Sequence, residues 1–599
     1  MRRFLIALVS ALTLVAAPAH AQDAKKVFKI GWAQDPQTLS PFVDYDEEDF
    51  RVWAINYDLL VNFSPDNLAP APGLATSWDV SPDKKTVTFH LVKGAKWSDG
   101  QPITSKDVKF SLDVLGGNGA LFTGYTDNVT SVQTPDANTV VVKTKKPDAR
   151  IVGGLFIYML PQHIWGKQSV KALTTTYRPQ IPMVGSGPFV VTEFKRNRII
   201  RMERNPNFRG PKPKFDEIQF VKYGSEDAVD RALSLGEIDM ITEVQASSFA
   251  RLSKAKGIKT VKAASPSFTE LAFNLCDKQH CPDAKFNPAV QDRTVRQAIG
   301  FAVDRARINE ISTRNTAFPG HGILPPFYKD FYAQPDGDLD YPYDPDRARQ
   351  MLDAAGWKPG DGGIREKGGQ RLSFDLFVRS ESQENIQDAR LVKEMAKDVG
   401  IEFKVQVVSV DKLTEITTRK VDGKMAPDFD TFIWGWGGDP YDPSTLLGLI
   451  TTKQIGGSSD SFYSNPEYDR LYDEQAGEFD LAKRQQIVKQ LVDISQRDLP
   501  YLVLTIDPIL QGYRTDSLSG AQQACPKPDG DLICDQVSYQ PWLTLGPPGA
   551  GGGRAASSSA GGGTSALVYV VIAVAVLLAA TIAFVIVRRR RQSQEAIEV

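Results

Sequence analysis

Histidine is scarce in this chain, with five among 599 residues. His90, His163, His280 and His321 each stand alone in the sequence, and His20 lies near the start. An enzyme usually shows a nucleophile beside its base, a set of metal ligands or a phosphate-binding loop. The chain has neither a G-x-S-x-G elbow nor a P-loop. We therefore predict no catalytic residue, no cofactor and no metal site, although the many carboxylates leave a glycosidase pair open on counting alone.

An excess of charge of either sign is also missing. The chain has 70 Lys and Arg residues against 72 Asp and Glu residues, a net charge of −2. Its one dense basic run is residues 588–591, so nucleic-acid binding has no electrostatic support. The content of 42% hydrophobic and 24% charged residues is that of an ordinary globular protein, and we expect a folded body.

Cysteine is scarce too, and its four residues form two local pairs, Cys276 with Cys281 and Cys525 with Cys534. Outside the cytoplasm, close pairs of this kind most simply form disulfides. The alternative is a four-cysteine metal site, but neither spacing is C-x-x-C and the pairs lie far apart in the sequence. We predict two short disulfides, each closing a loop.

Long apolar runs are confined to the two ends of the chain. At the start, residues 4–17 are apolar, follow Arg2 and Arg3, and precede small residues at Ala19 and Ala21. This is the pattern of a secretory signal peptide, which we place at residues 1–21 with cleavage after Ala21.

The second apolar run, residues 566–587, carries no charge and is long enough to cross a bilayer as one helix. The arginines of 588–591 follow it, and such a cluster stays cytoplasmic, so residues 588–599 are a cytoplasmic tail. Residues 546–565 are rich in Gly, Ser and Ala and form a flexible linker. We expect a single-pass protein of the cell membrane with its body outside the cell.

Strand and helix patterns are mixed along this body. Residues 86–92 alternate as in a half-buried strand, and 189–194 with 199–203 form the arms of a hairpin. Residues 292–308 carry an apolar stripe of helical period, and 344–355 carry another behind an Asp-Pro start. The body is therefore α/β or α+β, with several discontinuous lobes.

The segment 432–447, FIWGWGGDPYDPSTLL, stands out by composition. If it is extended, Trp434 and Trp436 share one face, and the glycines that follow allow close approach of backbone or ligand. Aromatic walls, exposed backbone and one carboxylate are suited to an organic ammonium group. The alternative is a core strand that ends in a tight turn, with Asp439 capping backbone amides. Our candidates for ligand binding here are Trp434, Trp436, Gly437, Gly438, Asp439 and Tyr441.

Residues 77–113 resemble the signature of a known family, the extracytoplasmic solute-binding proteins, family 5, of dipeptide, oligopeptide and nickel ABC importers. The core of the match, FHLVKGAKWSDG at 89–100, is long and unusual in composition. Further stretches resemble the family in the expected order along nearly the whole exported body: 35–39, 185–189, 204–206, 295–305, 344–357 and 436–443. The signal peptide, linker and C-terminal helix fall outside the resemblance.

This resemblance implies a periplasmic-binding-protein-like clamp of two lobes with an extra subdomain, closing by hinge motion around a buried ligand. Lobe I would comprise residues 22–60, 180–270 and 500–545, and the extra subdomain 61–179. Lobe II would comprise 271–499, with the hinge at the crossings near 270 and 500.

The resemblance also implies roles for site residues. In peptide-binding members an aspartate shortly after a tryptophan pairs with the ligand's α-ammonium, and Asp439 and Trp436 match them. The segment that holds Asp35, Gln37, Thr38 and Leu39 would line the peptide main chain together with the glycines before Asp439. The sequence of residues 436–443 also resembles the nickel-chelate binders of this family. Asp439, which this chain has in addition to that motif, favours peptides as the ligand.

We therefore expect the substrate-binding component of an ABC importer, which captures short peptides and hands them to permease subunits without catalysis. Its partners would be the peptide, the permease and, through its C-terminal helix, the membrane, and the protein would be a monomer. Three alternatives stay open: the same fold binding a metal chelate or another small solute, a surface receptor that does not transport, and an extracellular hydrolase. The short tail argues against signalling by this chain alone.

Overall fold

The computed structural model describes residues 25–36, 38–43, 47–64, 69–117, 123–284, 286–332, 334–335, 337–439, 442–521, 533 and 538–548. All of them lie in one compact unit, residues 1–551. The predicted signal peptide, the predicted membrane span 566–587 and most of the linker lie outside the described residues. Among the described residues, no helix combines the length and the apolar character that crossing a membrane requires.

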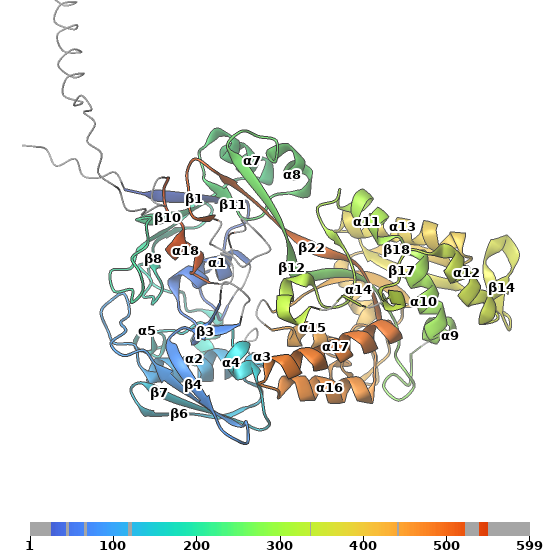
Figure 1. Cartoon of the computed structure of the whole chain (residues 1–599), viewed down its shortest axis with the longest axis horizontal. Coiled ribbons are helices and arrows are strands. Elements are labelled where there is room, and N and C mark those ends of the chain that lie inside the picture. The colour runs from blue at the N-terminus through green and yellow to red at the C-terminus, as the bar shows by residue number, and fades with distance from the viewer. Residues whose placement is uncertain are drawn as a thin grey trace, which may run out of the picture. The chain divides into compact units, whose positions relative to one another are not determined.

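A mixed sheet runs through the described part of this unit (Figure 1). Its strands follow the order β18-β17-β21-β12-β22-β11-β1-β10-β9-β8, and β13 adds to β22. Their bounds are β1 Val27–Trp32, β8 Phe189–Lys195, β9 Ile199–Arg204, β10 Glu217–Lys222, β11 Met240–Ile241, β12 Ile258–Phe273, β13 Phe318–Pro319, β17 Ser373–Arg379, β18 Glu402–Val408, β21 Thr431–Gly437 and β22 Tyr501–Arg514.

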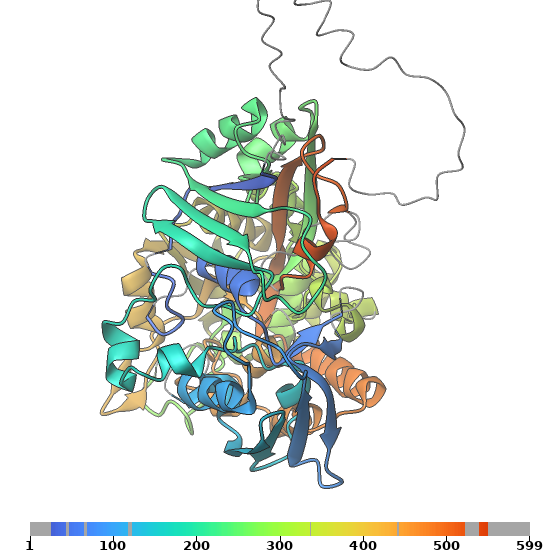
Figure 2. The ribbon, with the colours of Figure 1, turned by 90° about the vertical axis from the view of Figure 1, so that its left-hand side faces the viewer.

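The long strands β12 and β22 are antiparallel and lie side by side in both ribbon views (Figures 1 and 2). Their pairing runs from Ile258–Arg514 to Ala264–Pro508, and resumes from Phe268–Ile506 to Ala272–Tyr501. The residues between, 265–267, form an irregularity in this ladder. Pro266 and Pro508 have no amide hydrogen to donate, and prolines in sheets concentrate at such irregularities.

The hydrophobic interior is divided on either side of this irregularity. One core is built from residues 28–263 and 513–545. Two further cores come from residues 268–506, and alternation along β12 supplies both, because Leu271 and Phe273 point to one and Phe268 and Ala272 to the other.

A separate sheet has the order β4-β5-β7-β6. The strand predicted at 86–92 is confirmed as β5, with Val87, Phe89 and Leu91 buried on one face. Nearby, Thr104 and Asp107 cap α2 reciprocally. The bounds of this sheet are β4 Ala75–Val80, β5 Thr86–Leu91, β6 Val129–Asp136 and β7 Thr139–Thr144. Shorter strands are β2 Val61–Phe63, β3 Pro70–Pro72, β14 Lys358–Pro359, β15 Arg365–Lys367, β16 Gln370–Arg371, β19 Lys420–Val421 and β20 Lys424–Met425.

Helices cover these sheets. In chain order they are α1 Glu47–Asn56, α2 Ser105–Ser111, α3 Thr123–Thr126, α4 Arg150–Gly153, α5 Gln162–Trp165, α6 Val170–Thr175, α7 Glu226–Leu235, α8 Ala246–Leu252, α9 Pro288–Gln291, α10 Arg293–Ala302, α11 Arg305–Ser312, α12 Pro345–Ala354, α13 Gln383–Asp398, α14 Val410–Thr417, α15 Ser444–Gly448, α16 Pro466–Ala476, α17 Leu481–Asp498 and α18 Pro541–Thr544. The mixed α/β class expected from the sequence is confirmed.

One helix prediction is wrong. The stripe at 292–308 predicts a single helix, but the structure has two, α10 and α11. Asp292 caps the first as expected, accepting the amide hydrogen of Thr294 at 2.9 Å. Asp304 then begins a new helix by accepting from the amide of Arg307 at 3.0 Å, and Val303 is extended. The hairpin of β8 and β9 and the Asp344-capped α12 are as predicted.

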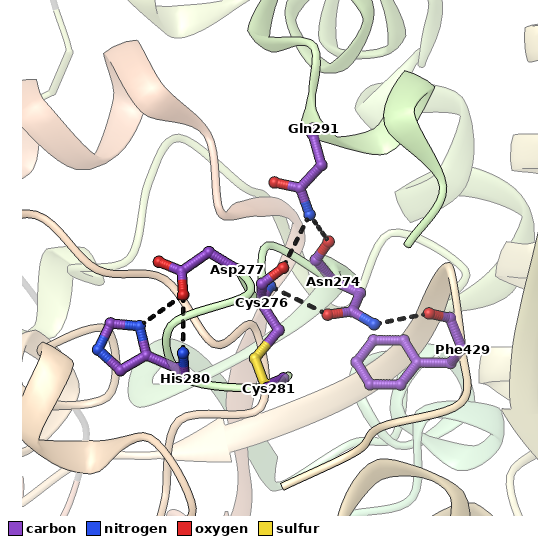
Figure 3. The surroundings of a disulfide bond; sticks show 7 residues. All are labelled: Asn274, Cys276, Asp277, His280, Cys281, Gln291 and Phe429. Atoms are coloured by element: carbon purple, nitrogen blue, oxygen red, sulfur yellow. Dashed lines mark hydrogen bonds and ion pairs between the residues drawn. A yellow bond between two sulfur atoms is a disulfide. The ribbon is translucent and has the colours of Figure 1, made fainter. Parts of the chain in front are cut away.

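Cys276 and Cys281 form a disulfide (Figure 3), with their Cα atoms 5.9 Å apart. Both cysteines are fully buried. Asn274 holds the start of the loop, since its side chain accepts from the amide of Cys276 and donates to the carbonyl of Phe429. The second predicted pair, Cys525 and Cys534, lies outside the described residues.

Candidate functional site

A cavity of about 1390 Å³ lies where segments distant in sequence meet. One wall comes from residues 125–156 and the opposite wall from residues 436–476. The irregularity between β12 and β22 contributes Ser265, Pro266 and Ser267, with Asp507 and Pro508 beside them. The cavity, called the cleft below, is thus bounded by both halves of the interior and by the strands that join them.

Asp439 is held on one wall of the cleft directly after β21. Its side chain accepts a hydrogen bond from the hydroxyl of Tyr125 at 2.5 Å, and its backbone carbonyl accepts from the hydroxyl of Tyr328 at 2.7 Å. Asp439 is 6% exposed. Burial and then the charge of Asp439 raise the pKa of Tyr125 well above its usual value, so this hydroxyl stays a donor at neutral pH. The carboxylate can still accept further donors from a cationic ligand.

Asp442, three residues later, has a different role. Arg484 of α17 lies 2.8 Å from it, and the amide of Ser444 donates to it at 2.9 Å. Burial would raise the pKa of Asp442, but the charge of Arg484 and these hydrogen bonds outweigh burial and lower it. Both aspartates line the cleft, but Asp442 is committed to Arg484, to the turn and to the start of α15.

Trp434 and Trp436 stand on the same face of β21, as their spacing predicts. Trp436 lines the cleft, and its indole Nε1 donates to Asp460 at 2.9 Å. Trp434 is not part of the cleft lining. The guanidinium of Arg379 lies 4.9 Å from the centre of its ring.

Gly437 and Gly438 line the cleft next to Trp436. The amide of Gly438 donates to the carbonyl of Pro266 at 2.8 Å and so joins β21 to the irregularity in β12. A Cβ atom at Gly438 would clash with the hydroxyl of Tyr328 and with Leu446. Glycine is therefore required here for close packing. Tyr441, the last candidate of this segment, lies outside the described residues.

The second predicted group, at 35–39, does not line this cleft. Asp35 accepts from the amide of Asn197 in the β8–β9 turn at 2.5 Å. Thr38 and Leu39 are buried, and the carbonyl of Leu39 accepts from Trp53 of α1 at 3.1 Å. Gln37 lies outside the described residues. The structure does not bring these residues to Trp436 and Asp439, and their role stays a prediction.

Contacts between the two walls close the rim of the cleft. Lys84 pairs with Glu478 at 3.0 Å, and Lys146 with Asp473 at 2.5 Å. The amide of Ala149 donates to the carbonyl of Ala476 at 2.7 Å. These contacts join segments more than three hundred residues apart in sequence, so the two sides of the cleft touch at its rim.

Sequence reasoning missed Tyr125, Glu270, Asp460 and Asp507. Two of them carried a usable signal. Glu270 is a charged residue inside the apolar stretch 268–273, and Asp507-Pro508 interrupts the apolar run of β22. Tyr125 and Asp460 carried none, because only tertiary contacts bring them to the β21 turn. Among the described residues, no three His, Cys, Asp or Glu side chains are grouped so as to hold a metal ion.

Comparison with known proteins agrees with this architecture. The chain is 25% identical over 512 residues to the dipeptide-binding protein of Escherichia coli K12, covering 80% of this chain and 88% of that protein. Two solved structures share the fold: the oligopeptide-binding protein AppA of Bacillus subtilis with a nonapeptide (22% identity, TM-score 0.65, 87% and 98% covered), and NikZ of Campylobacter jejuni with Ni(L-His) (21%, 0.67, 87% and 99%). The expected two-lobed periplasmic-binding-protein fold is therefore confirmed.

The family model that matches is that of the bacterial extracellular solute-binding proteins, family 5, over residues 69–458. The match spans well over half of the chain, including the separate sheet, the irregularity in β12 and most of the cleft walls. It agrees with the resemblance carried by residues 77–113. The chain therefore belongs to the bacterial extracellular solute-binding proteins, family 5.

Proposed function

We propose that this protein captures short peptides outside the cell and delivers them to the permease of an ABC importer. Its family consists of solute-binding proteins of ABC transporters, which are not enzymes. The proposal of peptides is supported by the dipeptide-binding relative in Escherichia coli and by the structural neighbour that holds a nonapeptide. The observation that carries it is the position of Asp439 on the wall of the cleft, beside Trp436.

The ligand's α-ammonium would bind Asp439. Asp439 lies in the cleft with little exposure; its carboxylate accepts from the neutral hydroxyl of Tyr125, and its backbone carbonyl accepts from the neutral hydroxyl of Tyr328. Closure of the walls removes water, which strengthens the attraction between carboxylate and ammonium. Breaking a buried, hydrogen-bonded charge pair costs roughly 2–5 kcal/mol. Trp436 and the backbone of Gly437 and Gly438 would contact the peptide next to its N-terminus.

Closure would occur by bending at the irregularity between β12 and β22. The proposed lobes are residues 22–60, 180–270 and 500–545 against 271–499, with 61–179 as the extra subdomain. The division of the hydrophobic interior supports the separation of 271–499 from the rest of the body. The lapse in pairing at 264–268 supports a hinge slightly before residue 270 and, on β22, between 506 and 508.

Tethering completes the proposal. Residues 1–21 would direct export, residues 546–565 would act as the flexible linker, and residues 566–587 would anchor the body. The support for this part is the sequence pattern alone. A linker of this composition spans roughly 25 Å as a coil, which keeps the body close to the permease.

The test is calorimetric titration of the full chain in detergent micelles with a tripeptide, free and N-acetylated. We expect the free peptide to bind and the acetylated peptide to bind far more weakly. Asp439→Asn should remove this difference, since it removes the charge that selects the ammonium. Asp388→Asn is the matched control, because Asp388 is a buried acid outside the cleft lining. Equal binding of both peptides to the unaltered protein would refute the role of Asp439.

A metal chelate is the second candidate, because one structural neighbour holds Ni(L-His). Mass spectrometry and metal analysis of ligand that copurifies from the native host separate the two candidates. A peptide mixture supports the first, and nickel in equimolar amount with the protein supports the second.

A further inference from the structure

Glu270 is a carboxylate buried in the middle of the sheet. Its side chain is 0% exposed, and neither of its carboxylate oxygens has a hydrogen-bond partner among the described residues. It lies in β12 opposite Trp434 of β21 and Val503 of β22. Buried charged groups in proteins are almost always paired and hydrogen-bonded. A carboxylate in this position is therefore suited to a partner that the chain itself does not supply.

Two tryptophans and a second carboxylate lie on the same face as Glu270. Strand pairing sets Trp434 opposite Glu270 and Trp436 opposite Phe268, so both rings project to this side of the sheet. Asp460 reaches the same side, since it accepts from the indole of Trp436 at 2.9 Å and from the hydroxyl of Tyr501.

Negative charge outweighs positive charge around this position. After burial, the charges of Asp460 and Asp507 contribute most to raising the pKa of Glu270. Asp507 also faces Glu384 of α13. Arg379 is the cation that opposes them, but its guanidinium lies over Trp434 and its Nε donates to Asn385 at 3.0 Å. It makes no ion pair with a carboxylate of the described residues.

This region adjoins the cleft. Trp436 and Asp507 both belong to the cleft lining, and Glu270 lies behind them, three residues beyond the cleft-lining Ser267 along β12. Glu270, Asp460 and Trp434 do not line the cleft, so a side chain of the ligand would reach Glu270 by entering beside Trp436. We call Glu270, Asp460, Trp434 and Trp436 the acidic pocket; Asp507 stands at its edge, where it accepts a hydrogen bond from the hydroxyl of Thr269 at 3.3 Å.

We infer that the acidic pocket receives a cationic side chain of the bound solute, so that the protein prefers peptides containing lysine or arginine. This inference rests on the proposed function, because it takes the cleft to be the peptide site. Carboxylates supply the charge that an ammonium or guanidinium group requires. Tryptophan faces attract such organic cations through their ring electrons, which favours them over a small hydrated metal ion.

Binding of a cation beside Glu270 should also change the protonation of this carboxyl group. Burial and the neighbouring carboxylates favour the neutral form of Glu270 in the unliganded protein. A cation beside Glu270 favours its ionised form, so binding of a cationic peptide releases a proton. Binding of such a peptide therefore strengthens as the pH rises, whereas binding of a neutral peptide of the same size releases no proton from this group.

The experiment is calorimetry on the full chain in detergent micelles with Ala-Lys-Ala and Ala-Met-Ala, in two buffers of different ionisation enthalpy at pH 7. Methionine matches the length of the lysine stem and lacks its charge. We expect tighter binding of Ala-Lys-Ala, with proton release. Glu270→Gln should weaken Ala-Lys-Ala by roughly thirtyfold or more and leave Ala-Met-Ala unchanged. The control Asp430→Asn, at a half-buried acid outside the cleft lining and the acidic pocket, should leave both unchanged.

The outcomes separate the two proposals. If neither peptide binds, the proposed function fails. If Ala-Met-Ala binds as tightly as Ala-Lys-Ala, the peptide-binding function stands and the acidic pocket is refuted as a cation site. Should Glu270→Gln not fold, the unaltered protein decides: the inference is overturned if Ala-Lys-Ala releases no more protons than Ala-Met-Ala, and upheld if it does.

Discussion

Arg484 of α17 and Asp442 of the turn after β21 form a buried ion pair at 2.8 Å. Both side chains are almost fully buried, and Arg484 also donates to Gln475 and Ser444. The pair fixes the turn that carries Asp439 against the helices behind it. The position of Asp439, the carboxylate that we propose binds the ligand's ammonium, thus depends on an arginine that lies forty-two residues from Asp442 in sequence.

Removal of this arginine should be costly. Arg484→Met leaves Asp442 buried without its counter-charge, and we expect a loss of roughly 3–5 kcal/mol in unfolding free energy. Urea unfolding of the full chain in detergent measures it. The double variant with Asp442→Asn should recover part of the loss, because the uncompensated charge is then gone. Equal stability of the single and double variants would contradict this account.

Gly438→Ala should disturb the same turn by a steric route. The new Cβ would meet the hydroxyl of Tyr328 and the side chain of Leu446. Overpacking of this kind costs roughly 1–3 kcal/mol, and peptide binding should weaken because the turn shifts. Gly224→Ala is the control, since a Cβ at Gly224 meets nothing within 4 Å. Similar unfolding curves for both variants would rule out the predicted clash.

Asp388 should make stability depend on pH. Burial, and then the charge of nearby Glu384, raise its pKa to about 7. A carboxyl whose folded-state pKa is raised binds its proton more tightly in the folded protein. Its contribution to the free energy of unfolding is therefore complete below its ordinary pKa of 3.8 and is lost as the pH rises through 7. The slope is about 1.4 kcal/mol per pH unit within this window.

The matching measurement is the free energy of unfolding of the unaltered protein and of Asp388→Asn between pH 4 and 8. In the variant the free energy of unfolding should fall less steeply as the pH rises, because an amide does not ionise. The pKa values of Glu270, Asp460 and Asp507 are raised too. Because of these groups, the free energy of unfolding of the variant should still fall somewhat as the pH rises. Parallel curves for the two proteins would show that Asp388 does not titrate in this range.

Much of the local structure follows from sequence patterns. The alternation of Val87, Phe89 and Leu91 predicts β5, and the Asp-Pro start predicts α12, because both depend on neighbours in the chain. The apolar stripe at 292–308 predicts a single long helix where the structure has two. The stripe alone does not show that Asp304 caps the start of a second helix. The spacing of Trp434 and Trp436 correctly predicts a shared face.

The sequence by itself determined the mixed α/β class, the Cys276–Cys281 pair, the family resemblance and the segment on which Asp439 lies, because these depend on local periodicity, close spacing and ordered motifs. The tertiary structure alone decided that Tyr125 meets Asp439 and that Arg484 neutralises Asp442. It also brought Glu270 and Asp460 together behind Trp436, with Asp507 at the cleft lining beside them. Such contacts join residues far apart in the chain, and their energies depend on burial and on the charges that other strands and helices place around them.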